Sequence, residues 1–264
     1  LKVFSFSVVT SIYLQLNTVL LGFLKNALAV GYFAAATKVM QMLLTMSACL
    51  GSVMMPRASH LIAENKEDEF SRLIQKSYDF TLAIALPMTI GLIFCAPSLI
   101  TALCGVKFEH SILPSQIIAP IILMVAISNV FGIQVLFPKG KINIVTLSCG
   151  IGAVADLILN LCLIPFFSYI GTSIAYLGAE VATTVSMYFI GRKYIPIIYF
   201  KKSHLTYALG CIVMAFALYG LSLLQLPTLT ILLLQGCCGV LAYFIILCIC
   251  KDEMLVQILL KIKR

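Results

Sequence analysis

The chain has 264 residues, of which 61% are hydrophobic and 11% are charged, and its mean hydropathy is +1.08. A soluble domain has about 45–50% apolar and about 25% charged residues, so this composition indicates a protein with many membrane spans. It excludes a disordered chain and a disulfide-rich secreted scaffold. A transmembrane β-barrel is also disfavoured, because uninterrupted apolar runs such as 206–226 have the length of a spanning helix.

Windows of about 20 apolar residues predict about eight transmembrane helices. The predicted fold class is therefore all-α, a polytopic membrane helix bundle. The predicted spans are 3–24, 27–54, 79–104, 116–137, 143–166, 171–191, 204–226 and 228–250.

The basic residues support this count. If the spans alternate, Lys25 and Lys107 lie on one side of the membrane, Lys38 lies within a span, and every other Lys and Arg lies on the opposite side. Cytoplasmic loops collect Lys and Arg, so both ends of the chain are predicted to be cytoplasmic. The net charge of +8 then reflects the membrane topology, so no nucleic-acid partner is expected.

No cofactor, metal site or enzymatic activity is expected. The ten cysteines lie inside or at the ends of apolar runs, and we interpret them as reduced, buried side chains. The three histidines, His60, His110 and His204, are scattered along the chain. The longest predicted outer loop, 105–115, has too few reactive side chains for a catalytic centre.

The cytoplasmic loop 57–78 is long enough for a surface helix. Asn65 is its predicted N-cap. Phe70, Leu73 and Ile74 have the i, i+3, i+4 spacing of an apolar stripe, which we expect to lie on the lipid headgroups. Such a helix would either couple to a gate or simply connect two spans.

Three ionisable residues, Lys38, Asp156 and Glu180, fall well inside predicted spans. Such a side chain costs about 2.5–3.5 kcal/mol to insert at mid-membrane, so each needs a partner or a function. Lys38 either lines a water-filled cavity that attracts an anionic substrate or forms an ion pair with Asp156 or Glu180. The sequence leaves both interpretations open.

A polar stripe follows the fifth predicted span, because Ser148, Gly152, Asp156 and Asn160 recur every four residues. The stripe predicts either ordinary helix packing by small and amide side chains or a proton or cation relay at Asp156. A similar i, i+4 series in the sixth span contains Glu180.

Several segments resemble the polysaccharide biosynthesis flippases, the Wzx-type O-antigen and capsule repeat-unit translocases of the MATE-like (MOP) exporter superfamily. The order and spacing of the segments make the set specific, although each is weak alone. Position 17 is Asn where many members have Asp, and Asp156 stands where the family usually has a neutral amide. The matching segments are NTVLLG at 17–22, VGYFAAATK at 30–38, MPRAS at 55–59, GVKF at 105–108, PKGK at 138–141, LNLCLIP at 159–165 and GTSIA at 171–175.

The resemblance implies a transporter built from two six-helix lobes around a central cavity, with the matching motifs in the second lobe. Residues 1–192 are therefore expected to form the C-terminal six-helix lobe, and residues 193–264 two additional transmembrane helices and a cytoplasmic tail. The chain has no initiator Met and is too short for both lobes. We expect a fragment whose N-terminal lobe, a partner in function, is absent from this sequence.

The implied activity is translocation of an undecaprenyl-pyrophosphate-linked oligosaccharide repeat unit across the bacterial cytoplasmic (inner) membrane, for O-antigen, capsule or exopolysaccharide biosynthesis. A pyrophosphate-sugar head needs a cationic, hydrated lining, while its tail can remain in membrane lipid between helices. Lys38 is the first candidate for this lining, with Lys25 and Arg57 at its outer and inner ends and Asn17 as a further candidate. Asp156 and Glu180 are candidates for ion coupling.

Three alternatives to a flippase remain. A membrane polymerase or ligase acting on lipid-linked sugars should have a larger outer loop with catalytic Arg or His residues. A MATE-type small-molecule exporter for cations should have an acidic cavity, whereas the most central charge here is Lys38. A purely structural membrane subunit is the third alternative.

Overall fold

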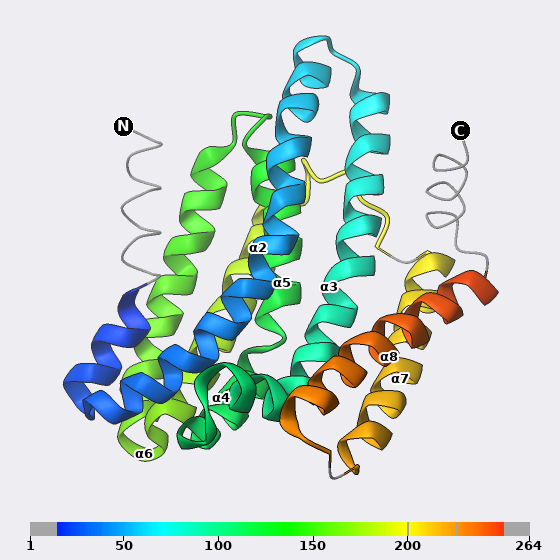
Figure 1. Ribbon diagram of the computed structural model, residues 1–264. Coiled ribbons are helices and arrows are strands. Elements are labelled where there is room, and N and C mark those ends of the chain that lie inside the picture. Colours follow the sequence, from blue (N-terminus) through cyan, green and yellow to red (C-terminus); the bar gives the residue numbers. More distant parts are fainter. Residues whose placement is uncertain (1–14, 200, 225, 251–264) are drawn as a thin grey trace.

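The computed structural model describes residues 15–199, 201–224 and 226–250, apart from the side chains of 46–53 and 202. Every element in these ranges is helical, which confirms the predicted all-α fold (Figure 1). The predicted span 3–24 lies partly outside them. The helices are Gln15–Leu24, α2 (Ala27–Ala63), α3 (Glu67–Cys104), η1 (Val106–Ser111), α4 (Ile112–Ile118), α5 (Ile121–Asn129), η2 (Val130–Leu136), α6 (Ile142–Gly191), α7 (Lys202–Ser222) and α8 (Thr228–Ile249).

Five of the described helices are long and apolar enough to cross a membrane, or six if a bent pair counts as one span. The bent pair extends beyond the predicted fourth span, 116–137: helical segments 106–118 and 121–136 meet at 44°. The predicted outer loop 105–115 is therefore mostly helical. Pro120 lies at this bend, where a residue without a backbone donor interrupts helical hydrogen bonding. The chain is therefore a multi-pass membrane protein.

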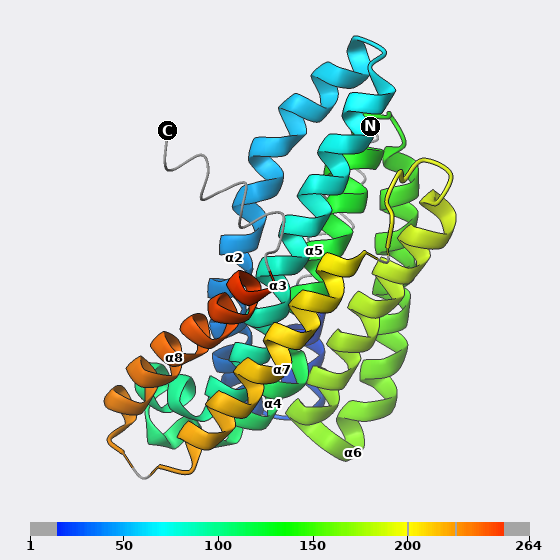
Figure 2. The same ribbon diagram turned by 90° about the vertical axis from the view of Figure 1, so that its right-hand side faces the viewer.

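Helix α6 contains two of the predicted spans. It has 50 residues and folds back at Ser168, whose φ of 52° and ψ of −130° interrupt the helix. A straight helix of that length would be about 75 Å long, far more than a bilayer. A Cβ added at Gly171 would lie 2.6 Å from the Leu163 carbonyl oxygen, so the two arms pack closely and antiparallel. Figure 2 shows both arms, which correspond to the predicted spans 143–166 and 171–191.

The predicted surface helix in the loop 57–78 is wrong. Helix α2 and helix α3 form a long hairpin, and α3 continues from Glu67 through the whole third span. Asn65 lies in the turn with a φ of 56° and caps neither helix. Phe70 and Ile74 are fully buried in a core cluster with residues of α2 and η2. The apolar stripe thus packs on protein instead of lipid headgroups.

The loops predicted to be cytoplasmic lie at one end of the bundle, shown at the top of Figure 1 for the α2–α3 turn. Lys139, in the turn before α6, forms an ion pair of 3.1 Å with Glu67 at the start of α3. The Gln75 amide hydrogen-bonds both backbone groups of Ile198, in the segment before α7. These contacts agree with the alternation of spans that the charge pattern predicts.

Helices α7 and α8 pack against each other and against α3 (Figures 1 and 2). Tyr207 and Leu218 of α7 are fully buried in the same core cluster as Phe70 of α3 and Val135 of η2. The last two described helices are therefore joined to the bundle by a shared apolar core.

Candidate functional site

A buried polar network links three residues of two helices. The Asn17 side-chain amide donates to Asp156 Oδ2 at 3.0 Å, and the Asn160 amide donates to Asp156 Oδ1 at 3.0 Å. The Asn160 amide also donates to Asn17 Oδ1 at 2.9 Å. Asp156 and Asn160 are fully buried and Asn17 is 3% exposed. Both carboxylate oxygens of Asp156 thus receive neutral amide donors.

The predicted stripe on the first arm of α6 faces the protein interior. Ser148, Gly152, Asp156 and Asn160 are all buried against neighbouring segments. Ser148 Oγ and Asn160 Oδ1 have no hydrogen-bond partner among the described residues. On the second arm, Glu180 is also buried, at 6% exposure. The two predicted acids therefore lie inside the helix bundle, within one antiparallel hairpin.

Lys38 takes a different position, since it is exposed on the surface of α2. Within the described ranges no carboxylate lies within ion-pair distance of its ammonium group. The interpretation of Lys38 as a structural ion-pair partner of Asp156 or Glu180 is therefore wrong. Lys38 is thus an exposed cation inside a span, without an ion-pair partner among the described residues.

Lys25 and Arg57, the other two cations predicted to line the cavity, do not converge on Lys38. Both are exposed. Arg57 lies about 29 Å along α2 from Lys38. Lys25 lies before the first residue of α2 and donates a hydrogen bond of 2.9 Å to the carbonyl of Pro165, close to the turn of α6. The three cations are spread along the length of the bundle.

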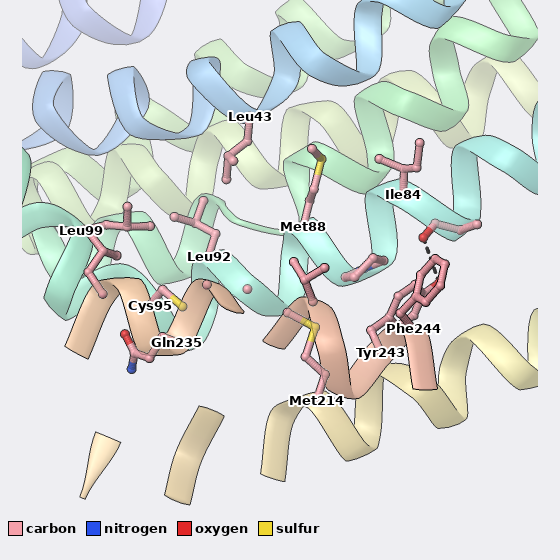
Figure 3. Close-up of a pocket in the computed structure, with 16 residues that line it drawn as sticks. Leu43, Ile84, Met88, Leu92, Cys95, Leu99, Met214, Gln235, Tyr243 and Phe244 are labelled. Carbon is pink, nitrogen blue, oxygen red and sulfur yellow. Dashed lines mark hydrogen bonds between the residues drawn. The ribbon is translucent and has the colours of Figure 1, made fainter. Parts of the chain in front are cut away.

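An apolar pocket of ≈ 430 Å³ lies between α3 and α8 (Figure 3). Leu43 of α2 and Met214 of α7 complete its walls. Pro87 and Gly91 of α3 expose little side chain here and leave room between the helices. No sequence pattern predicts this pocket, since its apolar lining residues look like ordinary lipid-facing surface.

A second cluster that sequence reasoning missed joins α3 to the start of α7. The Asp79 carboxylate binds Lys201 at 2.9 Å and the His204 ring at 3.0 Å, and it accepts from Gln75 at 2.7 Å. Burial, with the neighbouring hydroxyls of Tyr188 and Tyr78, raises the pKa of the nearby Tyr199 phenol. The cluster fixes the segment between α6 and α7 to α3.

Within the part of the chain that the structure describes, no three His, Cys, Asp or Glu side chains come together to hold a metal ion. The candidate site consists instead of three separate parts. These are the buried Asn17–Asp156–Asn160 network, the exposed Lys38 and the apolar pocket.

Comparisons with known proteins show what this chain is similar to. A family described as "Polysaccharide biosynthesis protein" matches residues 1–113. The chain is 26% identical over 180 residues to a protein of Escherichia coli (strain K12) named "Putative O-antigen transporter", covering 67% of this chain and 42% of that protein. A protein of the same name from Shigella dysenteriae is 28% identical over 181 residues, covering 67% and 44%.

Solved structures share the fold. The lipid II flippase MurJ in an inward closed conformation aligns with a TM-score of 0.79 at 17% identity, covering 95% of this chain and 53% of that one. An outward-facing MATE family transporter of the MOP superfamily aligns with a TM-score of 0.64 at 18% identity, covering 82% and 52%.

The chain thus spans about half the length of the proteins it matches. It is similar in sequence to a polysaccharide biosynthesis family over residues 1–113 and to two proteins named as putative O-antigen transporters, and it shares the fold of the solved MurJ and MATE structures.

Proposed function

We propose that this chain is part of a flippase that moves an undecaprenyl-pyrophosphate-linked oligosaccharide from the cytoplasmic to the outer leaflet of a bacterial inner membrane. The two ends of the helix bundle would then face the sides of the membrane that the charge pattern predicts, and both chain termini would be cytoplasmic. The relatives named as O-antigen transporters support a polysaccharide precursor as the substrate. The flippase fold supports translocation of a lipid.

One observation carries the proposal: helix α2 offers an exposed cation on one face and a wall of the apolar pocket on another. Lys38 is exposed on α2, and Leu43, about 7.5 Å further along the helix, lines the pocket against α3 and α8. A lipid-linked sugar needs both environments at once, a cation for its pyrophosphate and a hydrocarbon surface for its tail. Helix α2 presents both, a cation on one face and pocket lining on another, within about two turns of each other.

Lys38 is the proposed contact of the pyrophosphate at mid-membrane. An unpaired ammonium group inside a span is unfavourable, and an anionic substrate would relieve that cost. Because Lys25 and Arg57 lie far from Lys38, we propose that they act at the outer and inner ends of the path, in succession with Lys38. Asn17 contributes through its contact with Asp156, as it is buried.

Asp156 and Glu180 are the proposed coupling groups. A buried carboxylate whose only described donors are two neutral amides has no opposite charge to balance it. Binding and release of a proton or cation at Asp156 would change the charge inside the α6 hairpin, and Glu180 lies on the facing arm. Such a change could bias the lobe between two conformations.

Residues 1–192 would form one lobe of the transporter, with 193–264 as additional helices that complete the apolar pocket. The cavity would be closed by a second, N-terminal lobe of the same transporter. Alternating access would then come from movement of the two lobes around Lys38. No step of this cycle requires bond chemistry, so the proposed activity is transport and not catalysis.

The test is complementation in a host that lacks the full-length gene. Lipid-linked repeat units should accumulate on the cytoplasmic leaflet of the deletion strain, and the wild-type gene should restore surface glycan. Lys38→Ala should fail to restore export at an unchanged protein level, and Lys38→Arg should restore part of it. Lys107→Ala, which removes an exposed cation at the predicted outer end of the bundle, is the matched control and should export normally. Normal surface glycan in the deletion strain would refute the proposed function.

A further inference from the structure

His204, in the first turn of α7, lies between two groups that accept hydrogen bonds. Its Nδ1 lies 2.9 Å from the backbone carbonyl oxygen of Tyr199, and its Nε2 lies 3.0 Å from Asp79 Oδ1. A neutral imidazole has one N–H and one bare nitrogen, so it can donate to only one of these oxygens. The imidazolium ion donates to both. The geometry therefore fits a His204 ring that carries two protons.

The two acceptors of His204 belong to different segments of the chain. Asp79 lies on α3, where its Oδ2 pairs with Lys201 at 2.9 Å and its Oδ1 also accepts from the Gln75 amide. Tyr199 lies in the segment that joins α6 to α7. His204 thus connects this segment to α3, and both of its hydrogen bonds form only when both ring nitrogens are protonated.

The same segment makes two other contacts that involve no histidine. Gln75 hydrogen-bonds both backbone groups of Ile198, at 2.7 and 3.3 Å, and the Tyr199 ring packs edge-on against three other rings. These rings belong to Tyr188 of α6, Tyr78 of α3 and Phe131 of η2, at centroid distances of 5.2, 6.0 and 6.4 Å. Loss of one His204 hydrogen bond should therefore loosen the segment without unfolding the bundle.

The surroundings of His204 couple its charge to the position of the segment. The titratable side chains around the ring are Tyr78 and Asp79 of α3, Tyr199 and Lys201 before α7, and Tyr207 of α7. Among these residue types and histidine, only histidine ordinarily changes charge between about pH 5 and about pH 8. A positive charge in the first turn of a helix is unfavourable, so the second proton on His204 depends on its two acceptors. Proton binding and docking of the segment therefore support each other.

We propose that His204 is a proton-dependent latch, which holds the segment between α6 and α7 on α3 while the ring carries two protons and releases it when one is lost. The charged ring stabilises the docked segment, so docking is strongest at low pH and weakens as the pH rises. In the predicted topology the latch lies at the cytoplasmic end of the bundle. The second arm of α6, which ends at this segment, would then be tied less firmly to α3 at higher cytoplasmic pH.

The experiment is hydrogen–deuterium exchange of the full-length protein in nanodiscs, from about pH 5.5 to about pH 8.5. The readout is the protection factor of the Ile198 amide, whose N–H donates to the Gln75 side chain only while the segment is docked. A protection factor is a ratio to the intrinsic exchange rate, so the ordinary effect of pH on amides cancels. The amides of α3 report whether the bundle stays folded.

In the wild-type protein the protection of Ile198 should fall about tenfold as the pH rises through this range, the effect of losing one hydrogen bond from a charged donor. His204→Gln has an uncharged side chain at every pH, so its protection should stay near the wild-type value at high pH throughout. His60→Gln is the matched control, because His60 is 70% exposed at the end of α2. It should keep the full pH dependence.

Constant protection of Ile198 in the wild-type protein across this range would overturn the proposal, and this result needs no variant. A pH dependence of undiminished size in His204→Gln would overturn it as well. Loss of α3 protection in parallel with Ile198 would indicate unfolding of the bundle instead of release of a latch, and would also contradict it. The readout does not involve export, so the result is the same whether or not the chain is part of a flippase.

Discussion

The hydroxyl of Tyr243 in α8 donates a hydrogen bond of 2.8 Å to the carbonyl of Ala83 in α3. Ala83 lies four residues before Pro87, which has no backbone N–H and leaves that carbonyl without its helical donor. A side chain 160 residues away thus supplies the missing hydrogen bond. The same repair occurs once more in α3, where the Gln116 amide donates at 2.9 Å to the carbonyl of Ile93, four residues before Pro97.

The first prediction follows from this repair. Tyr243→Phe removes only the hydroxyl and should lower the free energy of unfolding by about 0.5–1.5 kcal/mol. Pro87→Ala restores a backbone donor to the Ala83 carbonyl, so the hydroxyl should matter less in that background. A double-mutant cycle, measured by unfolding in mixed micelles, should therefore give a non-zero coupling energy between the two positions.

Tyr219→Phe is the control for that cycle, because Tyr219 is 56% exposed on α7. It should leave the unfolding midpoint unchanged in both backgrounds. Strict additivity of Tyr243→Phe and Pro87→Ala would show that the hydroxyl does not serve the carbonyl that Pro87 leaves free.

The second prediction concerns the α6 hairpin. A Cβ at Gly152 would overlap Thr183 Oγ1 and lie 3.2 Å from the Ala179 carbonyl oxygen, whereas one at Gly150 would meet nothing within 4 Å. Gly152→Ala should therefore destabilise the protein by about 1–3 kcal/mol, since close-packed interiors do not absorb an added methyl group. Gly150→Ala should be neutral or slightly stabilising, because alanine favours a helix. Thermal unfolding of the two variants side by side checks this, and equal midpoints would argue against close packing of the arms.

A third prediction addresses ion coupling. Asp156→Asn keeps a hydrogen-bonding side chain of the same shape but removes the charge. Export driven by an imposed ion gradient should fall to the level seen without a gradient, while binding of the lipid substrate persists. Glu109→Gln neutralises an exposed acid at the predicted outer end and should leave gradient dependence intact. Full gradient dependence in Asp156→Asn would remove this residue from the coupling step.

The fourth prediction concerns the segment that connects α6 to α7. Asp79→Asn weakens the ion pair with Lys201 and the contact with His204, so the segment 192–201 should detach more often from α3. Trypsin should then cleave after Arg192 or Lys193 several times faster, as proteolysis tracks local opening. Asp68→Asn removes an exposed acid on the same helix and is the control. An unchanged cleavage rate in Asp79→Asn would show that other contacts hold the segment.

The sequence by itself determined the helical fold, the approximate position of the spans and the segregation of charge. These features are local: an apolar run long enough to cross a bilayer must form a helix, because lipid offers its backbone no partner. The i, i+4 pairing of Asp156 with Asn160 was also readable, since helix geometry alone places the two side chains together.

Only the tertiary structure decided which polar groups meet and where an apolar surface becomes a pocket. Asn17 bonds Asp156 across 139 positions of sequence, and Lys38 proves to be exposed and unpaired among the described residues. The apolar stripe at Phe70 and Ile74 packs on α2 and η2, although its pattern equally suits a membrane surface. Hydropathy tells how much surface avoids water, but lipid and protein are equally apolar neighbours. The choice between them depends on the shapes of segments far apart in the chain.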